Sequence, residues 1–245
     1  MTLYDEMVRS GTFLFRWRSF LPLLFLPVLV LALDNYNYLG ESETYDYLWE
    51  VFCGAVAASG LSLRALTVGY APAHTSGRNT TQQKAGTLNT TGTYSIVRHP
   101  LYLGNFLIWL GIALFTRDGW LVLIAILAFW VYYERIMLAE EEFLSKRFGA
   151  EFEVWAGRTP AVVPAFRNWK PPMLPFSWKT VLARENPTLF ATVVMFFLLE
   201  VTGDFFAGKM PRVELGWILL LSAALVVYAV LWWMKKHNLL FVDGR

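Results

Sequence analysis

Residues 119–138 read GWLVLIAILAFWVYYERIML, and only Glu134 and Arg135, near the end of this stretch, carry a charge. A helix needs roughly 20 apolar residues to cross the hydrocarbon core of a bilayer. Because a backbone in lipid must satisfy its hydrogen bonds within its own segment, such a stretch is expected to be helical. The stretch therefore predicts a transmembrane helix, and other parts of the chain repeat its pattern.

The composition of the whole chain also favours a membrane protein. Hydrophobic residues make up 56% of the 245 residues and charged residues 16%, whereas a soluble domain carries about 25% charge. The charges collect between long apolar runs, so the lipid bilayer is the expected surrounding. The net charge of +2 is too small to suggest nucleic acid as a partner, and the basic residues do not line a groove-binding face.

Six apolar runs are expected to cross the membrane. The predicted fold class is therefore all-α, a polytopic bundle of about six transmembrane helices. Some runs are short or contain proline, but they are counted as spans because their backbone groups must bond internally in lipid. The runs comprise residues 20–39, 48–68, 101–116, 119–138, 188–203 and 215–234.

The basic residues predict the direction of these spans. With six spans, every lysine and arginine except Arg117, Lys209 and Arg212 falls on the side that holds both termini. The positive-inside rule then places both termini and the two long polar loops in the cytoplasm. We expect an integral membrane protein of the inner membrane in a bacterium, or of an ER-type membrane in a eukaryote.

The chain divides into four expected parts. Residues 1–70 form an N-terminal transmembrane hairpin, and residues 71–166 form a core made of a polar loop, a helical hairpin and an amphipathic segment. A segment rich in proline and tryptophan, residues 167–187, reads as an irregular surface linker. Residues 188–245 form a C-terminal transmembrane hairpin.

The richest chemical segment is Arg98-His99-Pro100-Leu101-Tyr102-Leu103-Gly104, where a polar loop enters the membrane. Proline is favoured at the first position of a helix, so the third span is expected to begin at Pro100. Arg98 and His99 then lie at a helix N-terminus, which stabilises an anionic group. Taken singly, these residues could instead be a membrane-side anchor, a solvated loop residue and an interfacial aromatic.

A second polar segment follows the fourth span and ends in Glu140-Glu141-Glu142. If the helix continues, Glu134 and Glu141 share one face, and Arg135 and Glu142 share another, as in a solvated ion pair. A helix C-terminus disfavours three carboxylates, so a cation is expected beside at least one of them. The alternative is an amphipathic extension with a wet acidic face.

The short turn at Arg117-Asp118 joins the third and fourth spans into an antiparallel hairpin. The start of one span and the end of the other must then be neighbours at one membrane face. The sequence therefore predicts a polar pocket that contains Arg98, His99, Tyr102 and the glutamates. Both charge signs and an aromatic ring would suit a zwitterionic ligand.

Two strings of the sequence resemble the signature of the isoprenylcysteine carboxyl methyltransferase and phospholipid methyltransferase superfamily. They are GTYSIVRHPLYLG at residues 92–104 and EEEFLSKRFGAEFEVW at residues 140–155, with Pro164 closing the second. They come in the family's order, are separated by one helical hairpin, and the resemblance covers about residues 85–166.

This resemblance implies an integral-membrane enzyme that uses S-adenosylmethionine, with no metal. It implies that residues 71–166 are the catalytic core and that the helical bundle has a cofactor pocket at its cytoplasmic face. It implies Glu141 and Arg98 as catalytic residues. The acceptor would be amphipathic or lipid-linked: a prenylcysteine carboxylate, a phospholipid amine, a lipid phosphate or a small thiol. The implied cofactor-binding residues are Arg98, His99, Leu101, Tyr102, Gly104, Glu140 and Glu141.

Two departures weaken a specific prenylcysteine interpretation. Arg135 stands five residues before Glu140, whereas an arginine one turn before the pair is expected in enzymes of that type. The C-terminal hairpin also follows the signature.

Two other functions are alternatives. One is a sterol-type reductase using NADPH, against which Pro100 and the glutamate pair argue. The other is a non-catalytic transporter or scaffold, which should carry ionisable residues at mid-span. The predicted spans are nearly free of such residues, and Glu200, near the end of the fifth span, is the main exception.

Overall fold

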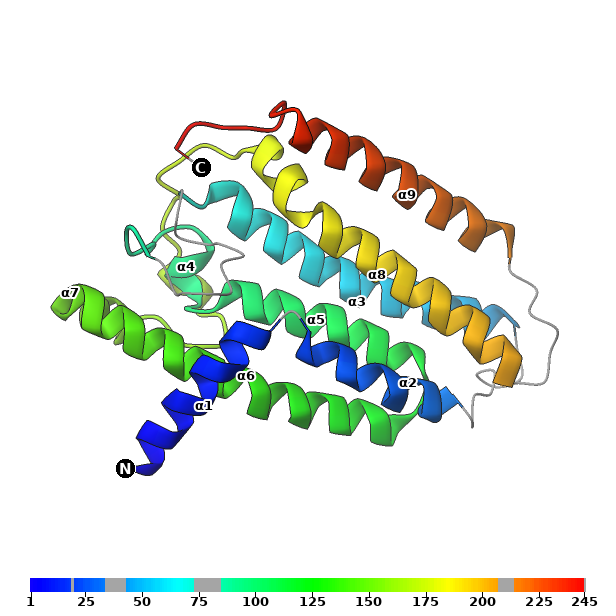
Figure 1. Cartoon of the computed structure of the whole chain (residues 1–245), viewed down its shortest axis with the longest axis horizontal. Helices are drawn as coiled ribbons and strands as arrows, with labels where there is room; N and C mark the ends of the chain where they lie inside the picture. Colours follow the sequence, from blue (N-terminus) through cyan, green and yellow to red (C-terminus); the bar gives the residue numbers. More distant parts are fainter. Residues whose placement is uncertain (19, 34–42, 73–84, 207–213, 245) are drawn as a thin grey trace.

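The computed structural model describes residues 1–18, 20–33, 43–72, 85–206 and 214–244, and every regular element within these ranges is a helix (Figure 1). The predicted all-α fold is therefore confirmed. The helices are α1 (Leu3–Trp17), η1 (Leu21–Phe25), α2 (Leu26–Ala32), α3 (Glu43–Tyr70), α4 (Thr93–Ile96), α5 (Pro100–Phe115), α6 (Gly119–Phe148), α7 (Ala150–Ala156), η4 (Phe166–Asn168), α8 (Trp178–Phe206) and α9 (Leu215–Lys236).

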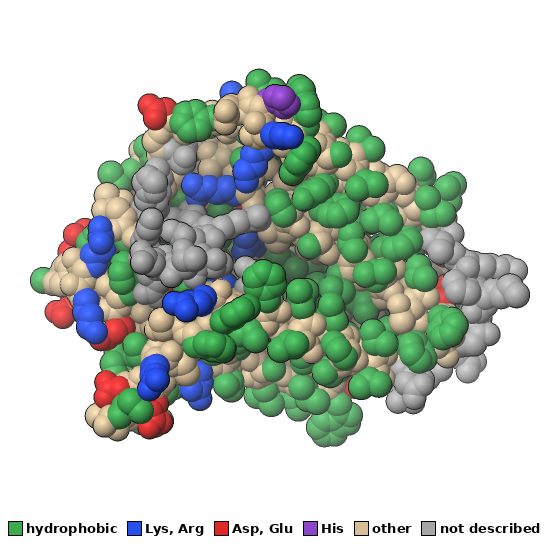
Figure 2. Space-filling model, viewed as in Figure 1, with side chains coloured by type: hydrophobic (Ala, Val, Ile, Leu, Met, Phe, Trp, Pro, Cys, Tyr) green, Lys and Arg blue, Asp and Glu red, His purple; other side chains and the backbone are tan. Residues whose placement is uncertain are grey.

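Four helices, α3, α6, α8 and α9, are long and apolar enough to cross a membrane. Each contains one predicted span, so the chain is an integral membrane protein. Two shorter apolar helices, Leu23–Ala32 and Pro100–Phe115, correspond to the first and third predicted spans. Hydrophobic side chains cover the middle and right of the face shown in Figure 2, and lysine and arginine gather toward the left end.

The long helices lie side by side in the order α9, α8, α3, α5 and α6, and α1 packs across α6 (Figure 1). Both termini lie at the end of the bundle that also carries α4 and α7. We call this the motif end, because it also holds residues 92–104. That the motif end faces the cytoplasm stays a prediction.

Glycines allow α3 and α5 to approach each other closely. A Cβ atom added to Gly60 would lie 2.5 Å from the backbone oxygen of Gly104, and one added to Gly111 would lie 2.7 Å from the oxygen of Cys53. Small residues are the usual means of close helix packing in membranes. The α3–α5 pair is thus the tightly packed centre of the bundle, and it fixes the position of the short α5.

The prediction of an irregular linker over residues 167–187 is wrong in its second half. Helix α8 begins at Trp178 and runs through Pro187. Proline has no N–H to bond the carbonyl four residues earlier, which here is that of Ala183. The Lys235 ammonium of α9 donates to this oxygen at 3.2 Å, so a side chain of the neighbouring helix supplies the missing donor.

The first predicted span, residues 20–39, begins as the 3-10 helix η1 with a proline in its first turn and continues as α2. Residues 34–39 of that prediction lie outside the described ranges. The sequence interpretation did not include α1, whose Thr2 and Asp5 form a capping box. Such reciprocal bonds mark a helix N-terminus.

Candidate functional site

The hairpin of α5 and α6 brings the two predicted motifs together. Helix α5 begins at Pro100, as predicted, and Asp118 caps α6 by accepting from the backbone N–H groups of Trp120 and Leu121 at 2.8 and 3.1 Å. Helix α6 then continues to Phe148, well beyond its apolar part. The glutamates 140–142 are therefore helical, and Glu140 and Glu141 face the start of α5.

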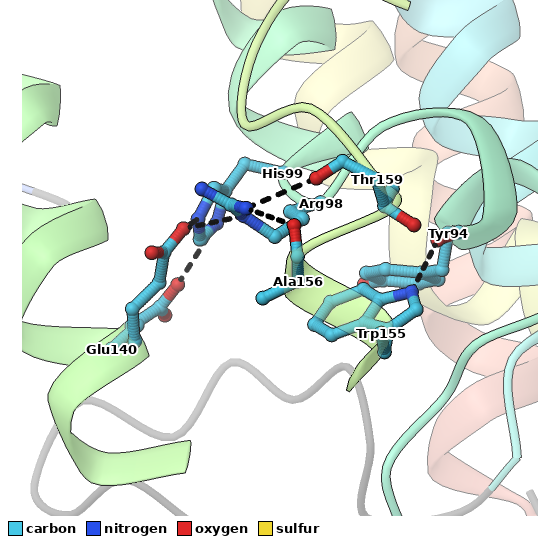
Figure 3. Close-up of polar contacts among 8 residues, drawn as sticks. Tyr94, Arg98, His99, Glu140, Trp155, Ala156 and Thr159 are labelled. Carbon is cyan, nitrogen blue, oxygen red and sulfur yellow. Dashed lines mark hydrogen bonds and ion pairs between the residues drawn. The ribbon is translucent and has the colours of Figure 1, made fainter. Parts of the chain in front are cut away.

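The chain around Arg98 is held by the segment that follows α7. The backbone N–H of Arg98 donates to the oxygen of Pro160 at 2.9 Å, and that of Ala165 donates to Ile96 at 2.9 Å. The indole of Trp155 donates to the backbone oxygen of Tyr94 at 3.0 Å (Figure 3). The two sequence strings that resemble the family signature, residues 92–104 and 140–155, thus hold each other in place at the motif end.

Arg98 and His99 converge on one oxygen of Glu141. The Arg98 Nε donates to Glu141 Oε1 at 2.8 Å, and the His99 Nε2 lies 2.8 Å from the same oxygen. The Arg98 Nη1 also donates to the backbone oxygens of Ala156 and Thr159, at 2.8 and 3.0 Å (Figure 3). Arg98 is thereby fixed by α6 and by the segment after α7.

Arg98 and His99 keep Glu141 charged. Its carboxyl lies past the apolar part of α6. Burial opposes the charged form, but the hydrogen bonds and electrostatic interactions with His99 and Arg98 outweigh it and lower the pKa of Glu141 below its usual range. The prediction that a cation meets at least one of the three carboxylates is confirmed.

Glu140 has a different set of neighbours. The Tyr102 hydroxyl donates to Glu140 Oε1 at 2.7 Å, and the His99 Nδ1 lies 3.7 Å from Oε2. The Arg18 Nη1 lies 3.9 Å from Oε1. The rings of His99 and Tyr102 are stacked with centroids 5.7 Å apart. We call Arg98, His99, Tyr102, Glu140 and Glu141 the polar cluster, and their predicted proximity is confirmed.

Two other predicted cofactor residues have different surroundings. Gly104 faces α3, where an added Cβ would lie 2.5 Å from the Cγ of Arg64 and 2.9 Å from the oxygen of Gly60. Its lack of a side chain is therefore explained by helix packing. Leu101 is half-buried in the first turn of α5. A cofactor contact of either residue stays a prediction.

The predicted ion pair of Arg135 and Glu142 is wrong. The Arg135 Nη1 donates to the Ser10 hydroxyl of α1 at 2.9 Å. Glu142 instead pairs with Lys146 at 2.6 Å and accepts from the Tyr4 hydroxyl. The bond to Glu142 raises the pKa of Tyr4 to about 12. Because α1 was not foreseen, its competition for these side chains could not be predicted.

Two cavities adjoin the polar cluster. One, of about 460 Å³, is lined by Arg98, Glu134 and Glu141 together with Leu3, Tyr4 and Met7 of α1. The other, of about 260 Å³, is walled by apolar side chains of η1, α2, α5 and α6 and includes Tyr132 and Tyr133. The Tyr133 ring lies 4.8 Å from that of Tyr102. The first cavity thus includes charged residues of the cluster itself, and the second lies next to the cluster through Tyr133.

Sequence reasoning missed a buried ion pair behind the cluster. The Arg64 guanidinium of α3 donates twice to Glu185 of α8, at 2.7 and 3.0 Å, and once to Asn105 of α5. Arg64 was counted only as a basic residue on one side of the membrane, and Glu185 lay in the predicted linker. An ionisable residue at the end of an apolar run was the available signal.

A family profile for phospholipid methyltransferases matches residues 72–151. The chain is 34% identical over 155 residues to the nickel-cobalt-cadmium resistance protein of Alcaligenes xylosoxydans xylosoxydans, a match covering 62% of this chain and 67% of that protein. It is 40% identical over 82 residues to the cobalt-zinc-cadmium resistance protein of Cupriavidus metallidurans, covering 34% and 38% of the two chains.

A shorter match joins the chain to an enzyme. It is 31% identical over 77 residues to the protein-S-isoprenylcysteine O-methyltransferase of Schizosaccharomyces pombe, covering 31% of this chain and 33% of that protein. The chain thus spans about two thirds of one of these relatives and about a third of the other two. No solved structure matches the chain.

Proposed function

Because this chain belongs to the isoprenylcysteine carboxyl methyltransferase and phospholipid methyltransferase superfamily, we propose that it transfers a methyl group from S-adenosylmethionine to an amphipathic acceptor. Family membership supports a membrane methyltransferase at this coarse level. The methyl donor, the acceptor and the residue roles are our proposal. The observation that carries it is the polar cluster, where Arg98 and His99 meet Glu141 and Tyr102 meets Glu140.

The residues of the cluster fit such a donor. S-adenosylmethionine, when bound, supplies an electrophilic methyl group on a sulfonium and carries an ammonium, a carboxylate and ribose hydroxyls. The carboxylates of Glu140 and Glu141 can accept from ammonium or hydroxyl groups. The first N–H groups of α5 and the Arg98 side chain suit a carboxylate, and the face of Tyr102 suits a sulfonium.

The protein's contribution to the reaction is placement and exclusion of water. Methyl transfer is an in-line displacement, so holding two partners in line can supply most of the rate. Arg98 and His99 fix the carboxylate of Glu141, and Tyr102 fixes that of Glu140, so both are oriented before a ligand arrives. Glu141 could remove a proton from an amine or a thiol, whereas an anionic acceptor needs no base.

An amphipathic acceptor is favoured by the two cavities. The 260 Å³ cavity is lined by Leu21, Leu24 and other apolar residues and suits a hydrocarbon tail. Its lining includes Tyr133, whose ring contacts Tyr102 of the polar cluster. A tail in this cavity would therefore place its head group beside the cluster.

Binding of S-adenosylmethionine to the purified protein in detergent tests the proposal. We expect saturable binding by the wild type and at least about tenfold weaker binding by His99→Ala and Glu141→Ala, because each loses a charge-assisted bond. Glu142→Ala is the matched control, since Glu142 bonds Tyr4 and Lys146 instead of the cluster. Folded wild type that binds NADPH and not S-adenosylmethionine would favour the reductase and refute the proposal.

A further inference from the structure

A network of hydrogen-bonded polar side chains joins four helices next to the polar cluster. Glu185 of α8 accepts two hydrogen bonds from Arg64 of α3, and Arg64 donates to Asn105 Oδ1 of α5. The Asn105 Nδ2 then donates to the hydroxyl oxygen of Tyr133 of α6 at 3.1 Å. The side chains of Arg64 and Glu185 are 13% and 9% exposed, so this network lies largely out of water.

The direction of every hydrogen bond in this network follows from Arg64. A guanidinium can only donate, so the carbonyl oxygen of Asn105 must face it and the amide nitrogen must face Tyr133. The Tyr133 oxygen therefore accepts, and its own hydrogen points elsewhere. Among the described residues, Asn105 is the one hydrogen-bond partner of this hydroxyl, so its hydrogen is available to a ligand.

The surroundings of Tyr133 indicate which ligand this hydrogen would meet. Tyr133 is 4% exposed and lines the apolar cavity of about 260 Å³. The centroid of its ring lies 4.1 Å from that of Phe129 and 4.8 Å from that of Tyr102. Tyr133 therefore lies both in the wall of the cavity and beside Tyr102 of the polar cluster, so it is placed to meet the head group of a ligand whose tail fills the cavity.

We propose that Tyr133 donates a hydrogen bond to an oxygen of the methyl acceptor, a hydrocarbon-tailed carboxylate or phosphate. Asn105, Arg64 and Glu185 are positioning residues that aim this hydroxyl. The inference rests on the proposed function and narrows its acceptor class. A carboxylate or phosphate that accepts this hydrogen keeps further oxygen lone pairs to receive the methyl group, whereas the single lone pair of an amine is needed for methyl transfer itself. It also assigns a role to the start of α8, which supplies Glu185.

Binding of tritium-labelled dodecanoate to the purified protein, measured by scintillation proximity in detergent at pH 8, tests the inference. We expect saturable binding by the wild type and a dissociation constant about tenfold to a hundredfold higher for Tyr133→Phe, because a hydrogen bond to a charged group is lost. Tyr132→Phe is the matched control, since Tyr132 lines the same cavity and its hydroxyl donates to the backbone oxygen of Leu14. Its affinity should equal that of the wild type.

Asn105→Asp separates a donor role from a structural one. The new carboxylate still accepts from Arg64 but also accepts the hydrogen of Tyr133, so the hydroxyl is turned away from the ligand. We expect the thermal stability of Asn105→Asp to equal or exceed that of the wild type while dodecanoate binding weakens as in Tyr133→Phe. Unchanged dodecanoate binding by Asn105→Asp or by Tyr133→Phe would overturn the inference, as would absence of saturable binding to the wild type.

Competition identifies the head group. Unlabelled dodecyl phosphate that displaces the label supports a phosphate acceptor, and displacement by dodecanoate alone supports a carboxylate. Displacement by dodecyltrimethylammonium as effective as that by dodecanoate would contradict the hydrogen-bond assignment. S-adenosylmethionine binding is measured in the same preparations. If it is absent while dodecanoate binding depends on Tyr133, the proposed function fails and the acid-binding site stands.

Discussion

Replacing Gly60 by alanine tests whether the close approach of α3 and α5 holds the bundle together. The added Cβ would lie 2.5 Å from the oxygen of Gly104 and 2.9 Å from the nitrogen of Ile108. Both are backbone atoms, so the helices must separate instead of a side chain turning aside. Overpacking of this kind costs about 1–3 kcal/mol. Gly54, on the same helix, has no such neighbour within 4 Å.

The Gly54→Ala variant makes the magnitude of this effect measurable. Both substitutions gain about 0.5–1 kcal/mol from replacing glycine in a helix, so this gain cancels in their difference. Gly60→Ala should then be about 1–3 kcal/mol less stable than Gly54→Ala. One kcal/mol moves the Tm of a chain of this size by about 2–4 °C, which predicts a difference of roughly 2–12 °C. Thermal unfolding in detergent, followed by tryptophan fluorescence, measures it, and equal Tm values would refute the packing argument.

Three further predictions concern single side chains. Arg135→Met should lower the Tm, because the bond to Ser10 is lost, and should leave S-adenosylmethionine affinity unchanged; weaker affinity would place Arg135 in the site. Lys235→Met should lower the stability by up to about 1 kcal/mol, because the oxygen of Ala183 loses its donor, whereas the exposed Lys179→Met should not. The lowered pKa of Glu141 predicts a contribution to stability that is complete above the unfolded pKa of about 4.3 and is lost as the pH falls through the folded pKa. The Tm of the wild type should therefore fall more steeply than that of Glu141→Gln below that pH, and parallel profiles would contradict the ion-pair account.

The sequence predicted the main features of the site because they follow from local rules. Pro100 marked the start of α5, and the turn at Arg117-Asp118 required α5 and α6 to be antiparallel. These two facts are sufficient to bring Arg98, His99 and Tyr102 beside the glutamates. Which oxygen each residue contacts depends on side-chain packing, which no spacing rule contains.

The features that were missed depend on contacts between distant parts of the chain. Arg18 reaches Glu140 because α1 packs across α6. Pro187 lies inside a helix because Lys235, far along the chain, replaces the lost donor. The pair of Arg64 and Glu185 joins α3 to α8, and nothing in the local sequence of either residue indicates its partner.

Methyl transfer by the purified protein can be measured by following the label of the methyl donor. Purified protein in lipid nanodiscs is incubated with S-adenosylmethionine labelled in its methyl group and with extracted membrane lipids. We expect label to enter the organic phase and S-adenosylhomocysteine to accumulate in equal amount, with both lost in Glu141→Ala and retained in Glu142→Ala. Folded wild-type protein that releases neither product, and instead oxidises NADPH, would show that the protein is not a methyltransferase.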